Sequence, residues 1–212
     1  MSNTSSEPTA SFLDLIGHAN ISDERRQFLA DAAESCVEET KSGKINLLCV
    51  CTHNSRRSQF SHFWSAYFAE KMGLSSVSAH SCGTEATECN PRTLQALSRA
   101  GVSVSTEGVN ENPKSTCVFN GTEVVLYSKA FGEATLPDNS IVALMCCDDA
   151  DQKCPIVPGA ISRVALHYRD PKYADSTADE SKAYDYANLT IAAEMQFFVS
   201  QIAKAIATKA SE

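Results

Sequence analysis

The fold of this chain is decided by residues 45–58, which read INLLCVCTHNSRRS. The first six residues form an apolar run typical of a buried strand, and the polar residues after it predict a loop followed by the start of a helix. Cys51 ends the strand, and Arg57 follows it after a loop of five residues. The N–H groups of such a loop, the positive end of the helix dipole and a guanidinium fork together surround a tetrahedral anion. We therefore predict an oxyanion site on residues 51–58.

Cys51 would lie beneath that anion. In a positive field of this kind the pKa of a thiol falls from about 8.5 to roughly 3.5–7.5, which makes it a thiolate nucleophile at neutral pH. The Ser58 hydroxyl is placed to hydrogen-bond the thiolate. The alternative is a buried cysteine at a strand end without a chemical role, and the spacing by itself leaves that alternative open.

The octet from Cys51 to Ser58 resembles the phosphate loop of the low-molecular-weight protein tyrosine phosphatase superfamily, which includes the thioredoxin-coupled arsenate reductases. The resemblance implies that Asn54 braces the turn. It also implies that Arg56, where many relatives carry a second cysteine, adds positive charge at the mouth of the loop. The implied oxyanion-binding residues are Thr52, His53, Asn54, Ser55, Arg56, Arg57 and Ser58.

The resemblance extends from about residue 45 to about residue 207. It implies that Asp170, followed by Pro171, is the general acid carried by a mobile loop over the anion. The alternative is that Asp170 is only a turn residue before a proline. One departure concerns the substrate: Lys172 stands where the tyrosine phosphatases usually place an aromatic residue that flanks the substrate ring, and Tyr173 comes one position later.

Residues 147–155, which read CDDADQKCP, resemble the redox loop of the arsenate reductases. The resemblance implies a disulfide relay in which Cys147 attacks Cys51 and then pairs with Cys154. We expect the polar segment between the two cysteines to be flexible enough for this exchange. Cys146 competes for the first role, but neighbouring residues of a strand point to opposite faces, so only one of the pair can face the site.

The net charge and the number of cysteines indicate which partners and which cellular compartment to expect. The 212 residues carry a formal net charge of −8, which argues against nucleic acid or an anionic membrane as a partner. No apolar run approaches the roughly 18 residues that span a bilayer. Nine cysteines are an odd number in a long chain, and several lie in apolar runs, which favours a reducing cytoplasm over a secreted disulfide scaffold.

The pattern of expected elements predicts an α/β fold. It alternates strands and helices and resembles a flavodoxin-like four-stranded parallel sheet with helices on both faces, in which ligands bind at the carboxyl ends of the strands. We expect residues 1–21 to be a disordered lead and residues 22–212 to be a single domain. Two additions are expected: an N-terminal helix within 22–44, and an insertion over 114–135 with a hairpin at Asn120-Gly121. The expected strands are 45–50, 77–81, 140–146 and 163–167, and the other helices 58–71, 91–100 and 178–209.

The main hypothesis is an arsenate reductase with Cys51 as nucleophile, Arg57 as oxyanion stabiliser and Asp170 as acid. Cys147 and Cys154 would form the relay, and thioredoxin or another thiol reductant would restore it without a bound cofactor. The first alternative is a low-molecular-weight tyrosine phosphatase, which hydrolyses a phosphocysteine with water and needs one thiol. The second is a non-catalytic oxyanion-binding or thiol-sensor module. A zinc site lacks the usual ligand spacings, so we expect no metal.

Overall fold

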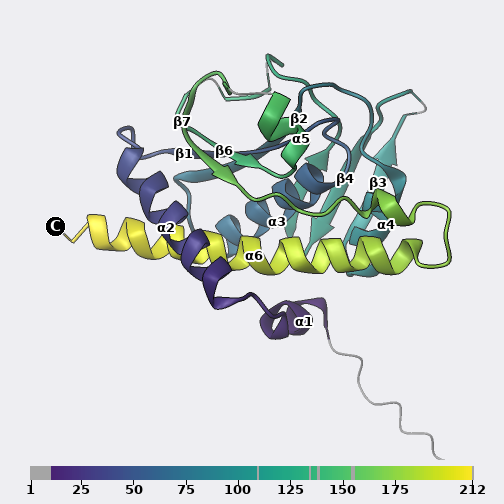
Figure 1. Cartoon of the computed structure of the whole chain (residues 1–212), viewed down its shortest axis with the longest axis horizontal. Coiled ribbons are helices and arrows are strands. Elements are labelled where there is room, and N and C mark those ends of the chain that lie inside the picture. The colour runs from purple at the N-terminus through teal and green to yellow at the C-terminus, as the bar shows by residue number, and fades with distance from the viewer. Residues whose placement is uncertain (1–10, 109, 134, 138, 154–155, 212) are drawn as a thin grey trace, which may run out of the picture.

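The central sheet has four parallel strands in the order β2-β1-β6-β7 (Figure 1). The computed structural model describes residues 11–211 except 109, 134, 138, 154 and 155. The strands are β1 (Ile45–Cys51), β2 (Val77–Gly83), β6 (Ile141–Met145) and β7 (Ala160–Ala165). All residues of β1 except one are buried, because β1 lies between two other strands and under helices. The predicted fold class is confirmed.

Three helices pack in layers over this sheet (Figure 1). They are α2 (Asp23–Glu39), α3 (Arg57–Lys71) and α6 (Glu180–Lys209). The helix α3 packs on β1 and β2, α2 packs on β7, and α6 lies against both α2 and α3. The aromatic residues of α3 lie in the core: Trp64 is fully buried and donates its indole N–H to the Asn188 side chain of α6 at 2.7 Å.

A smaller antiparallel sheet follows α4 (Pro91–Arg99). It contains β3 (Ser103–Glu107), β4 (Lys114–Phe119) and β5 (Thr122–Leu126). The predicted hairpin is present, and φ values of 47° and 86° at Asn120 and Gly121 agree with the left-handed turn that the Asn-Gly pair favours. Strand β3 was not predicted from the sequence, because its residues are polar and mostly exposed.

Two expectations are wrong. Residues 12–18 of the expected disordered lead form helix α1 (Phe12–His18), which begins with a capping box between Ser11 and Asp14. Its Phe12 ring stacks on Trp64 with centroids 5.2 Å apart, so this segment packs against the core. The segment after Cys147 was expected to be flexible and is instead the short helix α5 (Asp148–Lys153).

The last strand begins about three residues earlier than predicted and ends before the chain turns at His167, whose φ is 50°. The segment after it leads to a single-turn helix, η1 (Pro171–Ala174), just before α6. Among the described residues, no helix has the length and hydrophobicity that a membrane span requires.

Candidate active site

Hydrogen bonds between its own side chains hold the loop after β1 in a tight turn. Cys51 is buried, and its Sγ lies 2.9 Å from the Ser58 Oγ in the first turn of α3. The Asn54 amide donates to the same Ser58 oxygen at 2.8 Å. The Ser58 hydroxyl can accept from Asn54 and still donate its own proton to the sulfur when Cys51 is a thiolate. Asn54 itself has a φ of 45°, a left-handed conformation that asparagine tolerates well.

Neighbouring segments hold the loop in this shape. The Asn54 Oδ1 accepts from the Lys129 backbone N–H at 2.9 Å, and the His53 carbonyl accepts from the Ser128 hydroxyl at 2.8 Å. The buried Gln59 amide donates to the Asn54 carbonyl at 2.6 Å. These positioning residues were not predicted from the sequence. A buried glutamine in the first turn of α3 offered a local signal, whereas Ser128 and Lys129 carried none, because only the tertiary fold brings them to the loop.

The Cys51 thiol lies in an environment that opposes ionisation. Burial raises its pKa, while the hydrogen bond from Ser58 and those from the backbone N–H groups of Ser55 and Ser58 lower it; the net direction is upward. The expected depressed pKa is therefore wrong for this arrangement of the site. The largest cause is burial, and the nearby Cys146 thiol also raises the pKa.

Arg57 brings the predicted general acid to the loop. Its Nη2 donates to Asp170 Oδ2 at 2.7 Å, and its Nη1 donates to the Tyr168 carbonyl at 2.9 Å. Asp170 caps η1 by accepting from the Lys172 N–H at 3.0 Å. The Arg57 Nε is buried and has no hydrogen-bond partner among the described residues. One donor of the fork therefore remains for a ligand.

A cavity of about 190 Å³ lies over Cys51. It is lined by Cys51, Thr52, His53, Ser55, Arg56, Arg57, Asp149, Asp170 and Lys172. Six of the predicted loop residues and the predicted acid therefore meet around one small space. Tyr173 is not among the lining residues: its ring stacks under Arg169 at 3.8 Å and lines a separate groove beside α6.

Arg56 also lines this cavity, and its guanidinium contacts two residues beyond the loop. Its Nε donates to the Tyr184 hydroxyl at 2.8 Å, and its Nη2 lies 3.6 Å from Asp175 Oδ2. Arg56 therefore lies at the mouth as expected, and Asp175 compensates part of its charge there. His53 is half-exposed and lies 3.5 Å from Glu85 at the rim.

Cys147 and Cys146 point in different directions, as the alternation of strand residues predicts. The Cys147 Sγ lies 3.6 Å from the Thr52 Oγ1 of the loop and accepts from the Ala150 N–H at 3.4 Å. The Cys146 Sγ lies 3.4 Å from Ser61 in α3. Cys147 is therefore the cysteine of the pair that faces the loop. The predicted partner Cys154 lies outside the described residues.

Helix α5, which follows Cys147, is held by basic side chains. His167 reaches Asp148 Oδ1 at 3.2 Å and Asp151 Oδ2 at 2.7 Å, and Arg163 also pairs with Asp151. Burial alone would raise the pKa of Asp151, but the hydrogen bonds from Arg163 and His167 lower it overall. Within the described part of the chain, no three His, Cys, Asp or Glu side chains are grouped to hold a metal ion.

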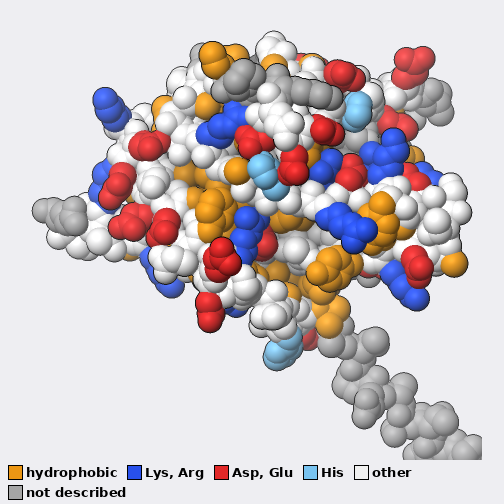
Figure 2. Space-filling model, viewed as in Figure 1, with side chains coloured by type: hydrophobic (Ala, Val, Ile, Leu, Met, Phe, Trp, Pro, Cys, Tyr) orange, Lys and Arg blue, Asp and Glu red, His pale blue; other side chains and the backbone are white. Residues whose placement is uncertain are grey.

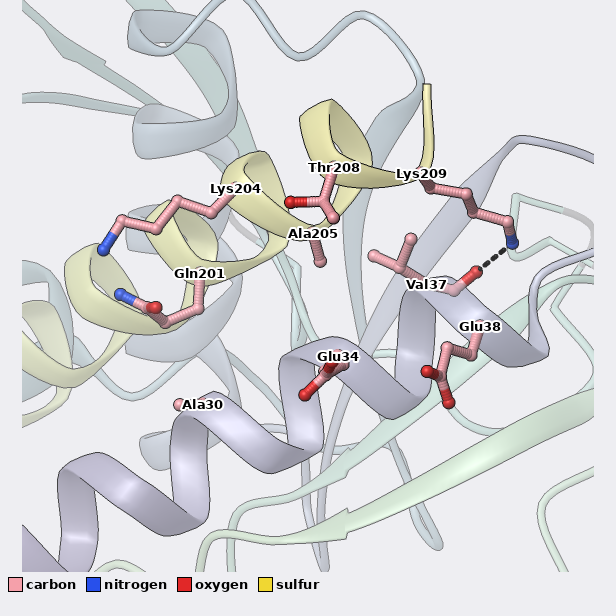
Figure 3. Close-up of a pocket in the computed structure, with 9 residues that line it drawn as sticks. All are labelled: Ala30, Glu34, Val37, Glu38, Gln201, Lys204, Ala205, Thr208 and Lys209. Atoms are coloured by element: carbon pink, nitrogen blue, oxygen red, sulfur yellow. Dashed lines mark hydrogen bonds between the residues drawn. The ribbon is translucent and has the colours of Figure 1, made fainter. Parts of the chain in front are cut away.

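A second cavity, of about 410 Å³, lies between α2 and α6 (Figure 3). In Figure 3, Lys209 of α6 donates to the Val37 carbonyl of α2, at 2.8 Å, and Glu34 and Glu38 line the groove from α2. It is lined by none of the loop residues and holds no cysteine or histidine. The smaller cavity over Cys51 is the candidate active site, since it joins a thiol, an arginine and a carboxylate.

Comparison with known proteins agrees with this geometry. A family model described as low molecular weight phosphotyrosine protein phosphatase matches residues 46–126, which contain the whole loop. The first half of the described fold is therefore similar to this family. An arsenate reductase from Bacillus licheniformis is 26% identical over 66% of this chain and 84% of the relative, and one from Bacillus subtilis is 29% identical over 64% and 80%. These similarities support a cysteine-based oxyanion enzyme of the phosphatase and arsenate reductase kind.

Solved structures of the superfamily share the fold. A mutant of YwlE from Bacillus subtilis has a TM-score of 0.53 with 16% identity, over 76% of this chain and 99% of that one. The solution structure of a low molecular weight protein tyrosine phosphatase from Bacillus subtilis has a TM-score of 0.52 with 16% identity, over 76% and 98%. At these identities the likeness concerns the fold alone.

Proposed function

We propose that this protein is an arsenate reductase that uses Cys51, Cys147 and Cys154 in turn. The observation that carries the proposal is the position of the second thiol: Cys147 lies within 3.6 Å of Thr52, the residue that follows the nucleophile in the loop. A phosphatase needs no second thiol there, whereas a reductase depends on one.

The first half of the reaction is displacement at arsenic. Arsenate enters the loop, the Cys51 thiolate forms an S–As bond, and the As–O bond opposite to it breaks. Loop N–H groups and Arg57 stabilise the charge on the remaining oxygens. Asp170 gives its proton to the departing oxygen, which leaves as water. Ser58 stabilises the thiolate before the attack.

The second half transfers two electrons to arsenic. The Cys147 thiolate attacks the Cys51 sulfur, an S–S bond forms, and the electron pair of the S–As bond stays on arsenic, which leaves as arsenite. Cys154 then attacks Cys147, so that Cys51 is released as a thiolate and the disulfide joins Cys147 and Cys154. A dithiol reductant such as thioredoxin reduces this disulfide.

The last exchange requires helix α5 to open. The helix has 6 residues, and an isolated helix shorter than about 12 residues is marginal in water. Cys147, only 1% exposed, is not accessible to a protein reductant until α5 moves. Contacts from His167 and Arg163 hold α5 in the resting state.

The residues at the mouth of the cavity favour a small anion as substrate and not an aryl phosphate. Lys172 lines the cavity of about 190 Å³, whereas Tyr173 faces the separate groove beside α6. A phosphotyrosine ring would gain no aromatic contact from Tyr173 in this arrangement. The arsenate reductases among the relatives agree with the same interpretation.

The alternative is a phosphomonoesterase, since Cys51, Arg57 and Asp170 are sufficient for one and the family model is that of phosphotyrosine phosphatases. One preparation decides between them: arsenate reduction coupled to thioredoxin and hydrolysis of p-nitrophenyl phosphate are measured side by side. We expect arsenate turnover in wild type and none in Cys51→Ser. Aryl phosphatase activity without arsenate reduction would replace this proposal with the phosphatase. If the protein shows neither activity, the non-catalytic alternative is favoured.

The relay has its own test, by mass mapping of disulfides after one turnover. Cys147→Ser should stop at the arsenic adduct, and Cys154→Ser should accumulate a Cys51–Cys147 disulfide. Wild type should carry the Cys147–Cys154 bond. Cys146→Ser is the matched control, because its sulfur faces α3, and it should behave as wild type. Wild-type rates in both Cys147→Ser and Cys154→Ser would contradict the relay.

A further inference from the structure

Two adjacent arginines of the loop reach opposite ends of the same small helix. Arg57 pairs with Asp170, the residue that caps the start of η1, at 2.7 Å. Arg56 lies 3.6 Å from Asp175, the residue at the end of η1. The acid-bearing turn is therefore held at both ends by consecutive residues of the anion loop.

The contact at the Asp175 end is one side of a triangle whose other two sides are hydrogen bonds to Tyr184. The Tyr184 hydroxyl accepts from Arg56 Nε at 2.8 Å and donates to Asp175 Oδ1 at 2.9 Å. Burial raises the pKa of Tyr184 to about 12, so the hydroxyl stays neutral and keeps its proton to donate. Arg92 lies 3.9 Å from Asp175 and pairs with Glu180 at 2.8 Å, which adds a second cation to this end.

The triangle is shielded from water. The side chains of Arg56 and Asp175 are 15% and 22% exposed, and Tyr184 is fully buried. Shielded, hydrogen-bonded ion pairs are screened less by salt than surface pairs are and hold a fixed geometry. The contact therefore restrains η1 more firmly than an exposed ion pair would.

We propose that Arg56 is a positioning residue that keeps Asp170 over the anion through Asp175 and Tyr184. This role rests on the proposed function of Asp170 as general acid. A bound oxyanion competes with Asp170 for the Arg57 guanidinium, so the Arg57 contact weakens when the acid is needed. The Arg56 contact involves no ligand and persists through that step. Displacement of a reacting group by about 1 Å can cost about a hundredfold in rate, so a fixed η1 has a kinetic effect.

A double-mutant cycle tests this role. The measured quantities are kcat and KM for Arg56→Gln, Asp170→Asn and the double variant, with whichever of arsenate and an alkyl phosphate the wild-type protein turns over, because both have a leaving group that needs a proton. If Arg56 acts through the acid, Arg56→Gln should lower kcat roughly ten- to a hundredfold with little change in KM, since a displaced acid acts in the transition state. In the Asp170→Asn background the same change should lower kcat less than about twofold, because the acid is already absent.

Further variants separate positioning from folding. Arg56→Lys, which keeps the charge, should recover part of the lost kcat, and Asp175→Asn should reproduce the Arg56→Gln effect. Arg99→Gln, which breaks an ion pair between α4 and Asp185 of α6 at 2.7 Å, is the matched control and should keep wild-type kcat. If Arg56→Gln does not fold, Asp175→Asn takes its place in the cycle.

The outcomes are distinct from those that test the proposed function. Equal losses of kcat in the wild-type and Asp170→Asn backgrounds, or a rise in KM alone, would overturn the inference and place Arg56 in anion binding. Wild-type kcat in both Arg56→Gln and Asp175→Asn would also overturn it. A wild-type protein that turns over neither substrate would instead contradict the proposed function.

Discussion

Arg57 and Asp170 form an ion pair of 2.7 Å that joins the first turn of α3 to the start of η1. Both residues were predicted to act on the same oxyanion, and they lie 113 positions apart in the sequence. In this arrangement each is the other's partner, so an incoming oxyanion must share the guanidinium with the carboxylate. The acid is thereby held beside the site by the residue that binds the anion. On the face shown in Figure 2, Lys and Arg side chains lie among Asp and Glu side chains, so the described residues of this face carry mixed charge and form no broad positive patch.

The first prediction concerns Asp170→Asn. Loss of a general acid lowers kcat by about 10² to 10⁴, but only for a leaving group that needs a proton. We expect a loss of that size with an alkyl phosphate and a much smaller one with p-nitrophenyl phosphate. The variant also frees Arg57 from its carboxylate, so inorganic phosphate should inhibit more strongly. Equal kcat losses with both substrates, measured by steady-state kinetics, would give Asp170 a structural role.

The second prediction concerns Ser58→Ala. Its hydroxyl is directed to the Cys51 sulfur at 2.9 Å and lowers a pKa that burial raises. Removal of the donor should raise the pKa of Cys51 further and slow its alkylation by iodoacetamide at pH 7, measured by peptide mapping across pH. Ser61→Ala is the matched control, because Ser61 is also buried in α3 but contacts Cys146. An alkylation profile of Ser58→Ala that overlays that of Ser61→Ala would exclude this role for Ser58.

Local patterns were sufficient to predict most of the fold. The apolar run of β1, the Asn120-Gly121 turn and the aromatic spacing of α3 each reflect contacts within a few residues, and all appear as predicted. The loop residues from Thr52 to Ser58 could be placed for the same reason, since strand, loop and helix start are contiguous.

Features that depend on distant residues were not predictable. The pairing of Arg56 with Tyr184 joins residues 128 positions apart, so no local sequence pattern indicates it. Helix α5 forms where a polar segment suggested flexibility, because Arg163 of β7 and His167 of the turn after it contact its aspartates. The raised pKa of Cys51 likewise follows from burial and from the nearby Cys146 thiol, neither of which a motif contains.

The third prediction concerns His167→Gln. His167 joins Asp148 and Asp151 of α5, and partly exposed pairs of this kind contribute about 0.2–1 kcal/mol each. Their loss should raise the open population of α5 about two- to thirtyfold, and Cys147 should be alkylated faster by the same factor. Hydrogen exchange of residues 148–153 measures the same opening. His80→Gln, in β2, is the control and should leave both rates unchanged. Unchanged protection of α5 in His167→Gln would contradict this role.

The fourth prediction concerns Gly83→Ala. A Cβ at Gly83 would lie 2.5 Å from the Thr52 carbonyl oxygen and 2.7 Å from the Asn54 nitrogen, both backbone atoms of the anion loop. Overpacking of this kind costs about 1–3 kcal/mol, and the loop must shift to relieve it. We expect a lower free energy of unfolding and weaker inhibition by phosphate. Gly17→Ala, where nothing lies within 4 Å, is the control and should lose neither. Wild-type phosphate affinity in a folded Gly83→Ala would show that the loop tolerates the displacement.

The fifth prediction concerns acid stability and His62. This histidine is 8% exposed beneath the sheet, where its Nδ1 lies 3.2 Å from the Ser81 hydroxyl. Burial, with smaller contributions from the charges of Lys129 and His80, lowers its pKa to about 3. An unfolded chain has a histidine pKa of about 6.5 and therefore takes up a proton below that pH, while the folded protein does not. His62 should therefore lower the free energy of unfolding by about 1.4 kcal/mol per pH unit as the pH falls from about 6.5 to about 3.

Urea unfolding of wild type and His62→Gln at intervals between pH 7 and pH 4 measures this contribution. The variant has no group that titrates at this position. Below pH 6.5, its free energy of unfolding should therefore change less steeply with pH than that of wild type, and the difference in slope corresponds to one proton. His18→Gln, exposed on α1, is the matched control and should keep the wild-type slope. The same slope in His62→Gln as in wild type would show that His62 becomes protonated in the folded protein, and the acid sensitivity would then have to come from the carboxylates.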